Sequence, residues 1–356
     1  LTVANGVVSG LSSSDGGITW TATFTPTNDI TSTSNLISLN AGGIADMAGN
    51  TNVGTTSSNN YAIDTQRPTA TIVVADTALS VGETSLVTIT FSEAVSGFDN
   101  SDLSVANGTL SAVSSSDGGI TWTAIFTPAA NTRDATNLIT LDNTGVSDAA
   151  GNTGTGTTDS GNYAIDTQVP TATIVVADTS LIIGETSLVT ITFSEAVSGF
   201  DNSDLTVSNG TLSTMSSTDG GVTWTATFTP SSNISDTSNV ITLDNTGLTN
   251  IAGNAGIGTT DSNNYVVDTV RPTATIIVAD TAIAAGETSL VTITFSEAIT
   301  GFTSADLTVA NGVVSGLSSS DGGITWTATF TPTNGITNTS NLISLNAGGI
   351  AETVGN

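Results

Sequence analysis

One internal repeat constrains this chain more than any other feature of its sequence. The tryptophans recur at a constant interval of 102 residues, at positions Trp20, Trp122, Trp224 and Trp326. The segments around them match in the same register, so the 356 residues hold about three and a half copies of one domain-sized unit. Residues 1–50 and 307–356 are the same half of that unit. We therefore expect the chain to be a segment of a longer polypeptide.

Alternation of apolar and polar residues predicts short β-strands in each copy. Residues 85–91 place Val87, Ile89 and Phe91 on one face and threonines on the other. Similar patterns predict further strands at residues 69–75, 103–106, 109–114, 120–126, 139–141 and 162–166. Asn107-Gly108 predicts a two-residue hairpin turn with positive φ at both positions. Seven short strands without a helical period favour an all-β fold of tandem antiparallel sandwiches of immunoglobulin type.

The aromatic residues are expected in the core of these sandwiches. On the strand at residues 120–126, Ile120 and Trp122 would face inward and the threonines outward. The same placement would make all four tryptophans core residues. The tyrosines of the last strand, Tyr61, Tyr163 and Tyr265, would be buried and anchored by their hydroxyl groups, although stacking on a ligand is an alternative role.

The repeat also sets the expected domain boundaries. Residues 67–168 and 169–270 would be complete copies, whereas 1–66 would hold the last five strands and 271–356 the first six. Neither partial copy can close its sandwich alone, so we expect frayed or partner-completed ends. Joined end to end, the copies would form an elongated rod.

A short junction joins successive copies. It reads Asp64-Thr65-Gln66-Arg67-Pro68 the first time and recurs at residues 166–170 and 268–272. The proline fixes its own φ and restricts the residue before it, which makes the connector stiff. An Asp just before such a connector is poorly placed for packing and well placed to bind a cation.

The charge balance excludes several classes of partner. The chain has 31 acidic residues, three Arg, no Lys and no His, for a net charge of −28. This charge argues against binding to nucleic acid or to an anionic membrane surface. Without Cys the chain has no disulfides, and without Cys and His it has no typical transition-metal ligands. A hard divalent cation would relieve the self-repulsion.

The direction of each strand sorts the acidic residues between the two ends of a copy. In the copy at residues 67–168, one group lies at the end facing the preceding copy, where it meets Asp64. This group comprises Glu93, Asp99, Asp102, Asp117, Asp142, Asp148 and Asn152. A second group lies at the opposite end, beside Asp166, and comprises Asp76, Glu83 and Asp134.

Calcium binds six to eight oxygen ligands in flexible geometry, and these loops supply such oxygens. We predict calcium sites at the junctions, bridged by the pairs Asp64 with Glu93, Asp166 with Glu195, and Asp268 with Glu297. The further predicted ligands are Asp99, Asp102, Asp148, Asn152, Asp201, Asp204, Asp306, Asp76, Glu83, Asp178 and Glu185. The alternative is that these acidic residues are solvated surface or bind the backbone of their own turns.

Several motifs together resemble the bacterial Ig-like repeats of giant calcium-dependent surface adhesins of the biofilm and RTX type. They are residues 85–94, Asp102-Leu103, Asn107-Gly108-Thr109, Trp122 to Pro128, and Asp148-Ala-Ala-Gly-Asn152. The resemblance covers the whole chain. It implies a non-enzymatic, extracellular extender at the bacterial cell surface, stiffened by calcium, that supports adhesion and biofilm formation.

Three positions depart from the pattern of that family. Asn250 and Glu352 replace the Asp that opens the Asp-Ala-Ala-Gly-Asn motif, and Thr303 stands where Asp99 and Asp201 stand in other copies.

Three other functions remain open alongside a mechanical spacer. An enzyme would have only paired carboxylates to use, the arrangement found in glycosidases. Direct binding to glycan or ice would use the outward row of Thr121, Thr123 and Thr127. A filament or surface-layer subunit would associate side by side or end to end with other copies of the chain.

Overall fold

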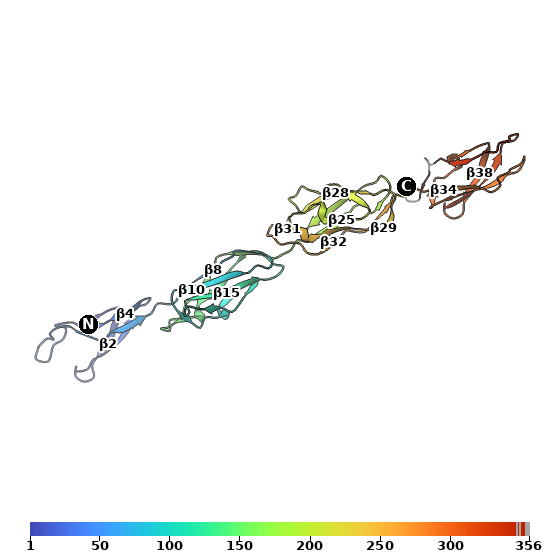
Figure 1. Cartoon of the computed structure of the whole chain (residues 1–356). Coiled ribbons are helices and arrows are strands. Elements are labelled where there is room, and N and C mark those ends of the chain that lie inside the picture. The colour runs from blue at the N-terminus through green and yellow to red at the C-terminus, as the bar shows by residue number, and fades with distance from the viewer. Residues whose placement is uncertain (347, 349, 353–356) are drawn as a thin grey trace. The chain divides into compact units, whose positions relative to one another are not determined.

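The computed structural model describes residues 1–346, 348 and 350–352. In that part of the chain the regular elements are β-strands and five single-turn 3₁₀ helices (Figure 1). The described residues include no helix with the length and apolar character needed to cross a membrane. The chain divides into two compact units, Leu1–Gln168 and Val169–Asn356.

The complete copy in the first unit, residues 67–168, is a sandwich of two sheets. The first sheet has the strand order β13-β15-β10-β8, and β14 also pairs with β15. Its strands are β8 (Ala70–Val74), β10 (Ser85–Phe91), β13 (Gly108–Leu110), β14 (Ser114–Ser115) and β15 (Thr121–Pro128). All pairs are antiparallel, and Ile89 lies opposite Ile72 on one side and Trp122 on the other.

The second sheet consists of two three-stranded parts, with the orders β12-β17-β19 and β16-β20-β9. Its strands are β9 (Ala78–Leu79), β12 (Leu103–Val105), β16 (Arg133–Asn137), β17 (Ile139–Asp142), β19 (Thr157–Asp159) and β20 (Tyr163–Asp166). The pair β9–β20 is parallel. Smaller elements are β11 (Val95–Ser96), which pairs with β18 (Ser147–Asp148), and the 3₁₀ helices η1 (Asn100–Asp102) and η2 (Asn143–Gly145).

The core of this copy lies between its two sheets. Val87, Ile89 and Phe126 of the first sheet and Ile139 and Leu141 of the second are fully buried. These are the inward positions that the alternation predicts. The all-β, tandem Ig-like fold is therefore confirmed.

The hairpin predicted at Asn107-Gly108 is wrong. β12 and β13 belong to different sheets, so the two residues carry the chain across the sandwich. Only Asn107 has a positive φ, of 56°. A Cβ on Gly108 would lie 2.4 Å from the Phe126 ring and 2.6 Å from the carbonyl oxygen of Thr127. Glycine is needed here because the backbone passes close against a core aromatic residue.

Other strand predictions also need correction. Residues 76–84 and 129–138, which lie between the predicted strands, contain β9 and β16. Ile120, expected inside, is 40% exposed, and it lies in the turn just before β15 rather than on the strand. On β15, Thr127 is exposed, but Thr121 and Thr123 are half-buried.

The tyrosine prediction is confirmed in part. Tyr163 and Tyr265 are fully buried. The Tyr265 hydroxyl donates to the carbonyl oxygen of Ser208 at 2.6 Å, as an anchor should. The hydroxyl of Tyr163 has no hydrogen-bond partner among the described residues, so the anchor is wrong there. Burial raises the pKa of Tyr163 to about 12.

The partial copy at the start of the first unit lacks the strands equivalent to β8 and β10. Its strands are β1 (Thr2–Val3), β2 (Gly6–Ser12), β3 (Thr21–Pro26), β4 (Thr31–Asn35), β5 (Ile37–Leu39), β6 (Thr56–Ser57) and β7 (Tyr61–Asp64). Trp20 is 55% exposed, so its expected place in a core is wrong. Its counterparts Trp122, Trp224 and Trp326 pack against the cores of the other copies.

The second unit begins with another complete copy, residues 169–270, which has the same strand orders and an equivalent core. Its strands are β21 (Ala172–Val176), β22 (Ser180–Leu181), β23 (Ser187–Phe193), β24 (Val197–Ser198), β25 (Leu205–Val207), β26 (Gly210–Leu212), β27 (Ser216–Ser217), β28 (Thr223–Pro230), β29 (Ser235–Asn239), β30 (Ile241–Asp244), β31 (Thr249–Asn250), β32 (Thr259–Asp261) and β33 (Tyr265–Asp268). Its 3₁₀ helices are η3 (Asn202–Asp204) and η4 (Asn245–Gly247).

The last copy holds the first sheet and part of the second. Its strands are β34 (Ala274–Val278), β35 (Ser289–Phe295), β36 (Ile299–Thr300), β37 (Leu307–Val309), β38 (Gly312–Ser319), β39 (Thr325–Pro332), β40 (Ile343–Leu345) and β41 (Ala351–Glu352), with the 3₁₀ helix η5 (Ser304–Asp306). Val291, Ile293 and Phe295 of β35 form the centre of its core.

Candidate metal centre

Three carboxylates meet where the first copy joins the second. Asp64 ends β7, Glu93 follows β10, and Asp148 ends β18. Each offers an oxygen, and the three oxygens lie within 4.8 Å of one another. Within the described part of the chain, this is the one group of three acidic side chains arranged closely enough to share an ion.

Asp148 is held as a carboxylate by its own loop. Its Oδ1 accepts hydrogen bonds from the N–H groups of Ala150 and Asn152, both at 2.9 Å, and its Oδ2 accepts one from Asn152 Nδ2 at 2.8 Å. Burial alone would raise the pKa of Asp148, which is only 4% exposed. The hydrogen bonds from Asn152 and the neighbouring backbone outweigh that effect and hold the pKa below its ordinary value.

Glu93 carries the electrostatic cost of this arrangement. Burial raises the pKa of the half-buried Glu93 carboxyl, and the negative charges of Asp148 and Asp64 raise it further. Bringing a third negative charge to this place is therefore unfavourable unless a cation balances it.

Two contacts tie the junction to this loop of the second copy. Asn152 Nδ2 donates to the backbone carbonyl oxygen of Asp64, in the first copy, at 3.2 Å. Arg67, the first residue of the second copy, donates from Nη1 to the backbone carbonyl oxygen of Thr153. Sequence reasoning did not find the Arg67–Thr153 contact. The sequence does single out Arg67 as a candidate for such a contact, because it is one of only three basic residues and lies within the junction itself.

The geometry fits a hard divalent cation. Two oxygens that bind one Ca²⁺ at about 2.3–2.6 Å can lie at most about 5 Å apart, which the spacing of these carboxylates satisfies. The donors are all oxygens, and Asp64 also lies half-buried.

The other predicted ligands at this end of the copy bind their own loop. Asp99 Oδ1 accepts from the N–H of Ser101 at 2.7 Å, and Asp102 Oδ2 accepts from the N–H of Asp99 at 2.9 Å, which caps η1. Asp201 and Asp204 repeat this arrangement at η3, and Asp306 does so with Thr303 at η5. These are the contacts expected if the side chains stabilise their own turns, which is the alternative to metal binding.

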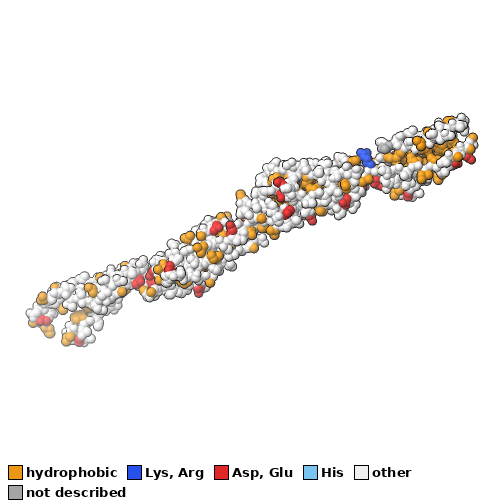
Figure 2. All heavy atoms as spheres, in the orientation of Figure 1, with side chains coloured by type: hydrophobic (Ala, Val, Ile, Leu, Met, Phe, Trp, Pro, Cys, Tyr) orange, Lys and Arg blue, Asp and Glu red, His pale blue; other side chains and the backbone are white. Residues whose placement is uncertain are grey.

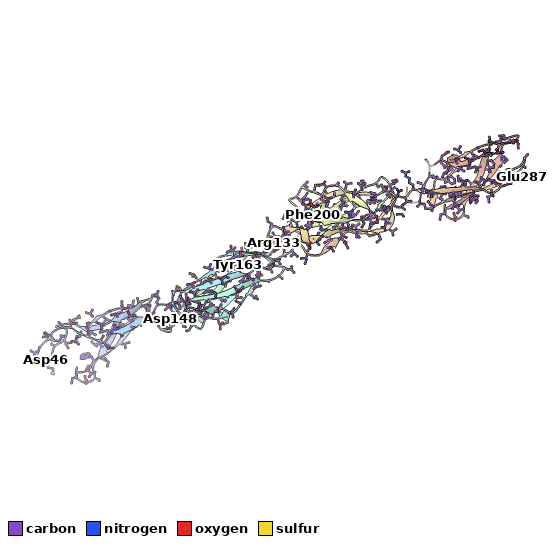
Figure 3. All side chains as sticks on the ribbon, in the orientation of Figure 1. Asp46, Arg133, Asp148, Tyr163, Phe200 and Glu287 are labelled. Carbon is purple, nitrogen blue, oxygen red and sulfur yellow. The ribbon has the colours of Figure 1, made fainter. Side chains whose placement is uncertain are left out.

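The predicted ligands at the opposite end also bind nearby backbone. Asp76 Oδ1 accepts from the N–H of Ala78 at 3.0 Å, and Glu83 Oε2 accepts from the N–H of Ser80 at 2.8 Å. Asp178 and Glu185 make the equivalent bonds to Ser180 and Ile182. In Figure 3, Asp148 marks the end of the copy nearest the first copy, and Arg133 marks the other end. Arg133 Nε lies 3.5 Å from Asp166 Oδ2.

The third copy differs at the position equivalent to Asp148. Asn250, 3% exposed, donates from Nδ2 to Glu195 Oε1 at 3.2 Å. In the third copy, the glutamate is therefore hydrogen-bonded by an amide, whereas in the second copy the carboxylate of Asp148 lies beside Glu93.

The last junction has Asp268 and Glu297 as its predicted bridging pair. Asp268 Oδ1 accepts from the N–H of Val270 at 3.3 Å, and Glu297 is half-buried. The side chain of Glu352 lies outside the described residues.

Comparison with known proteins identifies the domain type. The family described as "Bacterial Ig-like domain" matches residues 1–63, 64–165, 166–267 and 268–356. No curated protein matches the chain. Among solved structures, the chain is similar to FdeC, an adhesin of Escherichia coli, at 14% identity and a TM-score of 0.28. That alignment covers 79% of this chain and 93% of the other, and at such a score it carries no weight for function.

Proposed function

Because the chain belongs to the bacterial Ig-like domain family over its whole length, we propose that it is an extender segment of a bacterial cell-surface adhesin. The observation that carries this proposal is the tandem repetition of one sandwich, each copy with its own sheets. Repetition of this kind adds length between two ends of a protein. The proposed role is extracellular and non-catalytic, in support of adhesion and biofilm formation, without contact to nucleic acid or to the membrane surface.

We further propose that Ca²⁺ stiffens the junction through Asp64, Glu93 and Asp148. Motion between linked domains is the default where their interface is small. One ion bound by Asp64 of the first copy and by Glu93 and Asp148 of the second would connect the two directly. It would also remove the repulsion that raises the pKa of Glu93.

Equivalent sites at the other junctions are proposed from sequence correspondence. Asp166 with Glu195 and Asp268 with Glu297 occupy the same positions in the repeat as Asp64 with Glu93. Ions at each junction would turn the linked sandwiches into an elongated rod.

Calorimetry of the full chain tests the ion. Extracellular calcium modules bind with Kd of about 10⁻⁴–10⁻³ M, so about 10 mM CaCl₂ should stabilise an occupied copy by about 1.4–2.7 kcal/mol. We expect a higher melting temperature in CaCl₂ than in chelator. X-ray scattering of the same samples should show a larger maximum dimension with calcium if the junction stiffens.

A matched pair of variants locates the effect. Glu93→Gln removes one proposed ligand and should reduce the calcium-induced rise in melting temperature. Asp159→Asn removes one negative charge from the exposed end of β19 and should leave that rise unchanged. An equal rise in all three proteins would show that calcium acts elsewhere. Unchanged scattering together with a calcium-dependent melting temperature would remove the stiffening role alone.

A further inference from the structure

The first sheet of each copy carries no charged residue on its strands, although the chain has a net charge of −28. In the second copy, β8, β10, β13, β14 and β15 contain no Asp, Glu, Lys or Arg. The same holds for β21, β23, β26, β27 and β28 of the third copy and for β34, β35, β38 and β39 of the last. We call the outward side of this sheet the uncharged face.

The second sheet of the same copy provides the contrast. Its strands carry Arg133, Asp134, Asp142, Asp159 and Asp166. Figure 2 shows the Asp and Glu side chains of the visible surface in small separate groups, with uncharged surface between them. The acidic residues are therefore unevenly distributed between the two sheets.

The uncharged face is partly apolar as well as neutral. Val73 is 58% exposed, Leu86 is 46% exposed and Ile125 is 42% exposed. Leu86 and Ile125 are cross-strand partners, and Val73 lies one strand over, opposite Thr88. Adjacent side chains of this kind form a patch rather than single exposed residues.

Threonines surround this patch in a regular array. Thr90 lies opposite Thr71 on one side and Thr121 on the other, and Thr88 lies opposite Thr123. The last two copies repeat the pattern, with Val175 and Leu188 in one and Ile277 and Leu290 in the other, all more than half exposed. The last three copies thus each present a neutral and partly apolar surface.

We propose that the uncharged face is where a second copy of this chain docks. Two molecules of the same large negative charge repel wherever carboxylates oppose each other, and a contact between two neutral faces avoids that cost. Packing of one sheet on another, about 10 Å apart, is also how the two sheets inside each copy bury their apolar sides. Several equivalent faces in one chain would add weak contacts into a stable association.

This proposal goes beyond an extender role and does not depend on calcium at the junctions. It gives the extender a means of lateral association between neighbouring molecules. The carboxylates at the ends of the strands, such as Asp117 beside β15, would lie at the rim of the contact, as charged residues do in protein interfaces.

Sedimentation velocity of the full chain in chelator tests the proposal. Raising NaCl from about 0.1 M to about 1 M shortens the screening length from about 10 Å to about 3 Å and weakens the repulsion between copies. We expect self-association that grows with protein concentration and with salt.

Two triple variants with equal added charge locate the contact. Leu86→Glu with Leu188→Glu and Leu290→Glu places one carboxylate on each uncharged face and should weaken association about tenfold or more. Ser104→Glu with Thr206→Glu and Thr308→Glu places the same charge at exposed positions of the other sheet and should change it little. Melting temperatures of both proteins check that they fold.

A third variant, Val73→Thr with Val175→Thr and Ile277→Thr, keeps the face neutral but less apolar and should weaken association to an intermediate extent. The proposal is overturned if the wild type stays monomeric at all salt concentrations, or if both Glu variants weaken association equally. It is also overturned if the Leu→Glu variant loses only adsorption to a neutral polysaccharide or inhibition of ice recrystallisation, because the occupant would then be different.

Discussion

Asp148 in the second copy and Asn250 in the third occupy the same position, at the end of a two-residue strand, yet they affect the nearby glutamate in opposite ways. Asp148 raises the pKa of Glu93 by its charge, and Asn250 donates a hydrogen bond to Glu195. Both side chains accept bonds from the backbone of the same Ala-Gly-Asn turn. The loop therefore folds with either residue, and the change of one side-chain atom alters only what the end of the sandwich presents to its neighbour.

The same two copies differ at one edge of the first sheet. Asn263 bridges the edge of β21, with its Oδ1 accepting from the N–H of Val176 at 2.8 Å and its Nδ2 donating to the carbonyl oxygen of Val176 at 3.1 Å. The second copy has Gly161 at this position, with open space where a side chain would lie. The two copies share their strand registers and build their cores from equivalent strands, so these two polar differences can be compared on one scaffold.

The largest effect should come from the shared core. Ile89→Ala and Ile191→Ala each empty a fully buried position at the centre of a first sheet and should each destabilise their copy by about 2–5 kcal/mol. Hydrogen exchange with mass spectrometry on the full chain would report each copy separately. Losses that differ greatly between the two copies would contradict the equivalence of their cores.

Exchanging Asp148 and Asn250 between the copies should change the stability of each copy in chelator in opposite directions. Asn250→Asp replaces a buried hydrogen-bond donor by a second carboxylate and should destabilise the third copy by about 1–3 kcal/mol in chelator. Asp148→Asn should raise the stability of the second copy in chelator and reduce its response to calcium. Hydrogen exchange with and without calcium measures both, and no change in either variant would show that the two glutamates have equivalent surroundings.

Moving the Asn263 hydrogen bonds with Val176 from the third copy to the second should change stability by a smaller amount. Gly161→Asn should stabilise the second copy by about 1 kcal/mol, from new hydrogen bonds and a less flexible unfolded chain. The reverse change, Asn263→Gly, should destabilise the third copy by a similar amount. Chemical denaturation of each variant checks the sign, and destabilisation by Gly161→Asn would mean that the two edges differ in backbone conformation.

Titration should give the smallest difference between the copies. Hydrogen bonds from Thr121 and Thr223 hold the pKa of Asp117 and Asp219 at about 2, so these two residues should cost their copies similar stability as the pH falls from about 4 to about 2. The lowered pKa of Asp148, which has the uncharged Asn250 as its counterpart, should add to the acid loss of the second copy. The raised pKa of Glu93 acts in the opposite direction. The second copy should lose some stability as the pH rises from the ordinary Glu pKa of 4.5 through the raised one.

Denaturation in chelator across this pH range measures both effects. Glu93→Gln should abolish the loss above pH 4.5 and leave the acid loss intact. If the wild-type second copy instead gains stability as the pH rises above 4.5, the pKa of Glu93 is not raised in the folded protein.

Much of the fold follows from local patterning. The strand at residues 85–91 was predicted to the residue because its alternation is strict and one face is buried. The two-residue strand β9 and the polar strand β16 escape such reasoning because their pairing depends on distant partners in β20. Asn107-Gly108 misleads because a sharp turn looks the same in sequence whether it joins strands of one sheet or of two.

The candidate site shows a similar limit. Strand direction was enough to bring Asp64, Glu93 and Asp148 to one end of the sandwich. It could not separate them from Asp99 and Asp102, whose carboxylates bind backbone N–H groups two or three residues away. That difference depends on loop conformation, which the residue types alone leave open.

The parallel pairing of β9 with β20 has a consequence for a chain held under tension. Ala78 and Leu79 near the start of the copy run beside Ala164 and Ile165 near its end, in the same direction. A force that draws the two ends apart slides these strands past each other, so their hydrogen bonds are strained together and must rupture together. The third copy has the same parallel pairing between β22 and β33, where Ser180 and Leu181 run beside Val266 and Val267. In each complete copy, this parallel strand pair is therefore placed to resist stretching.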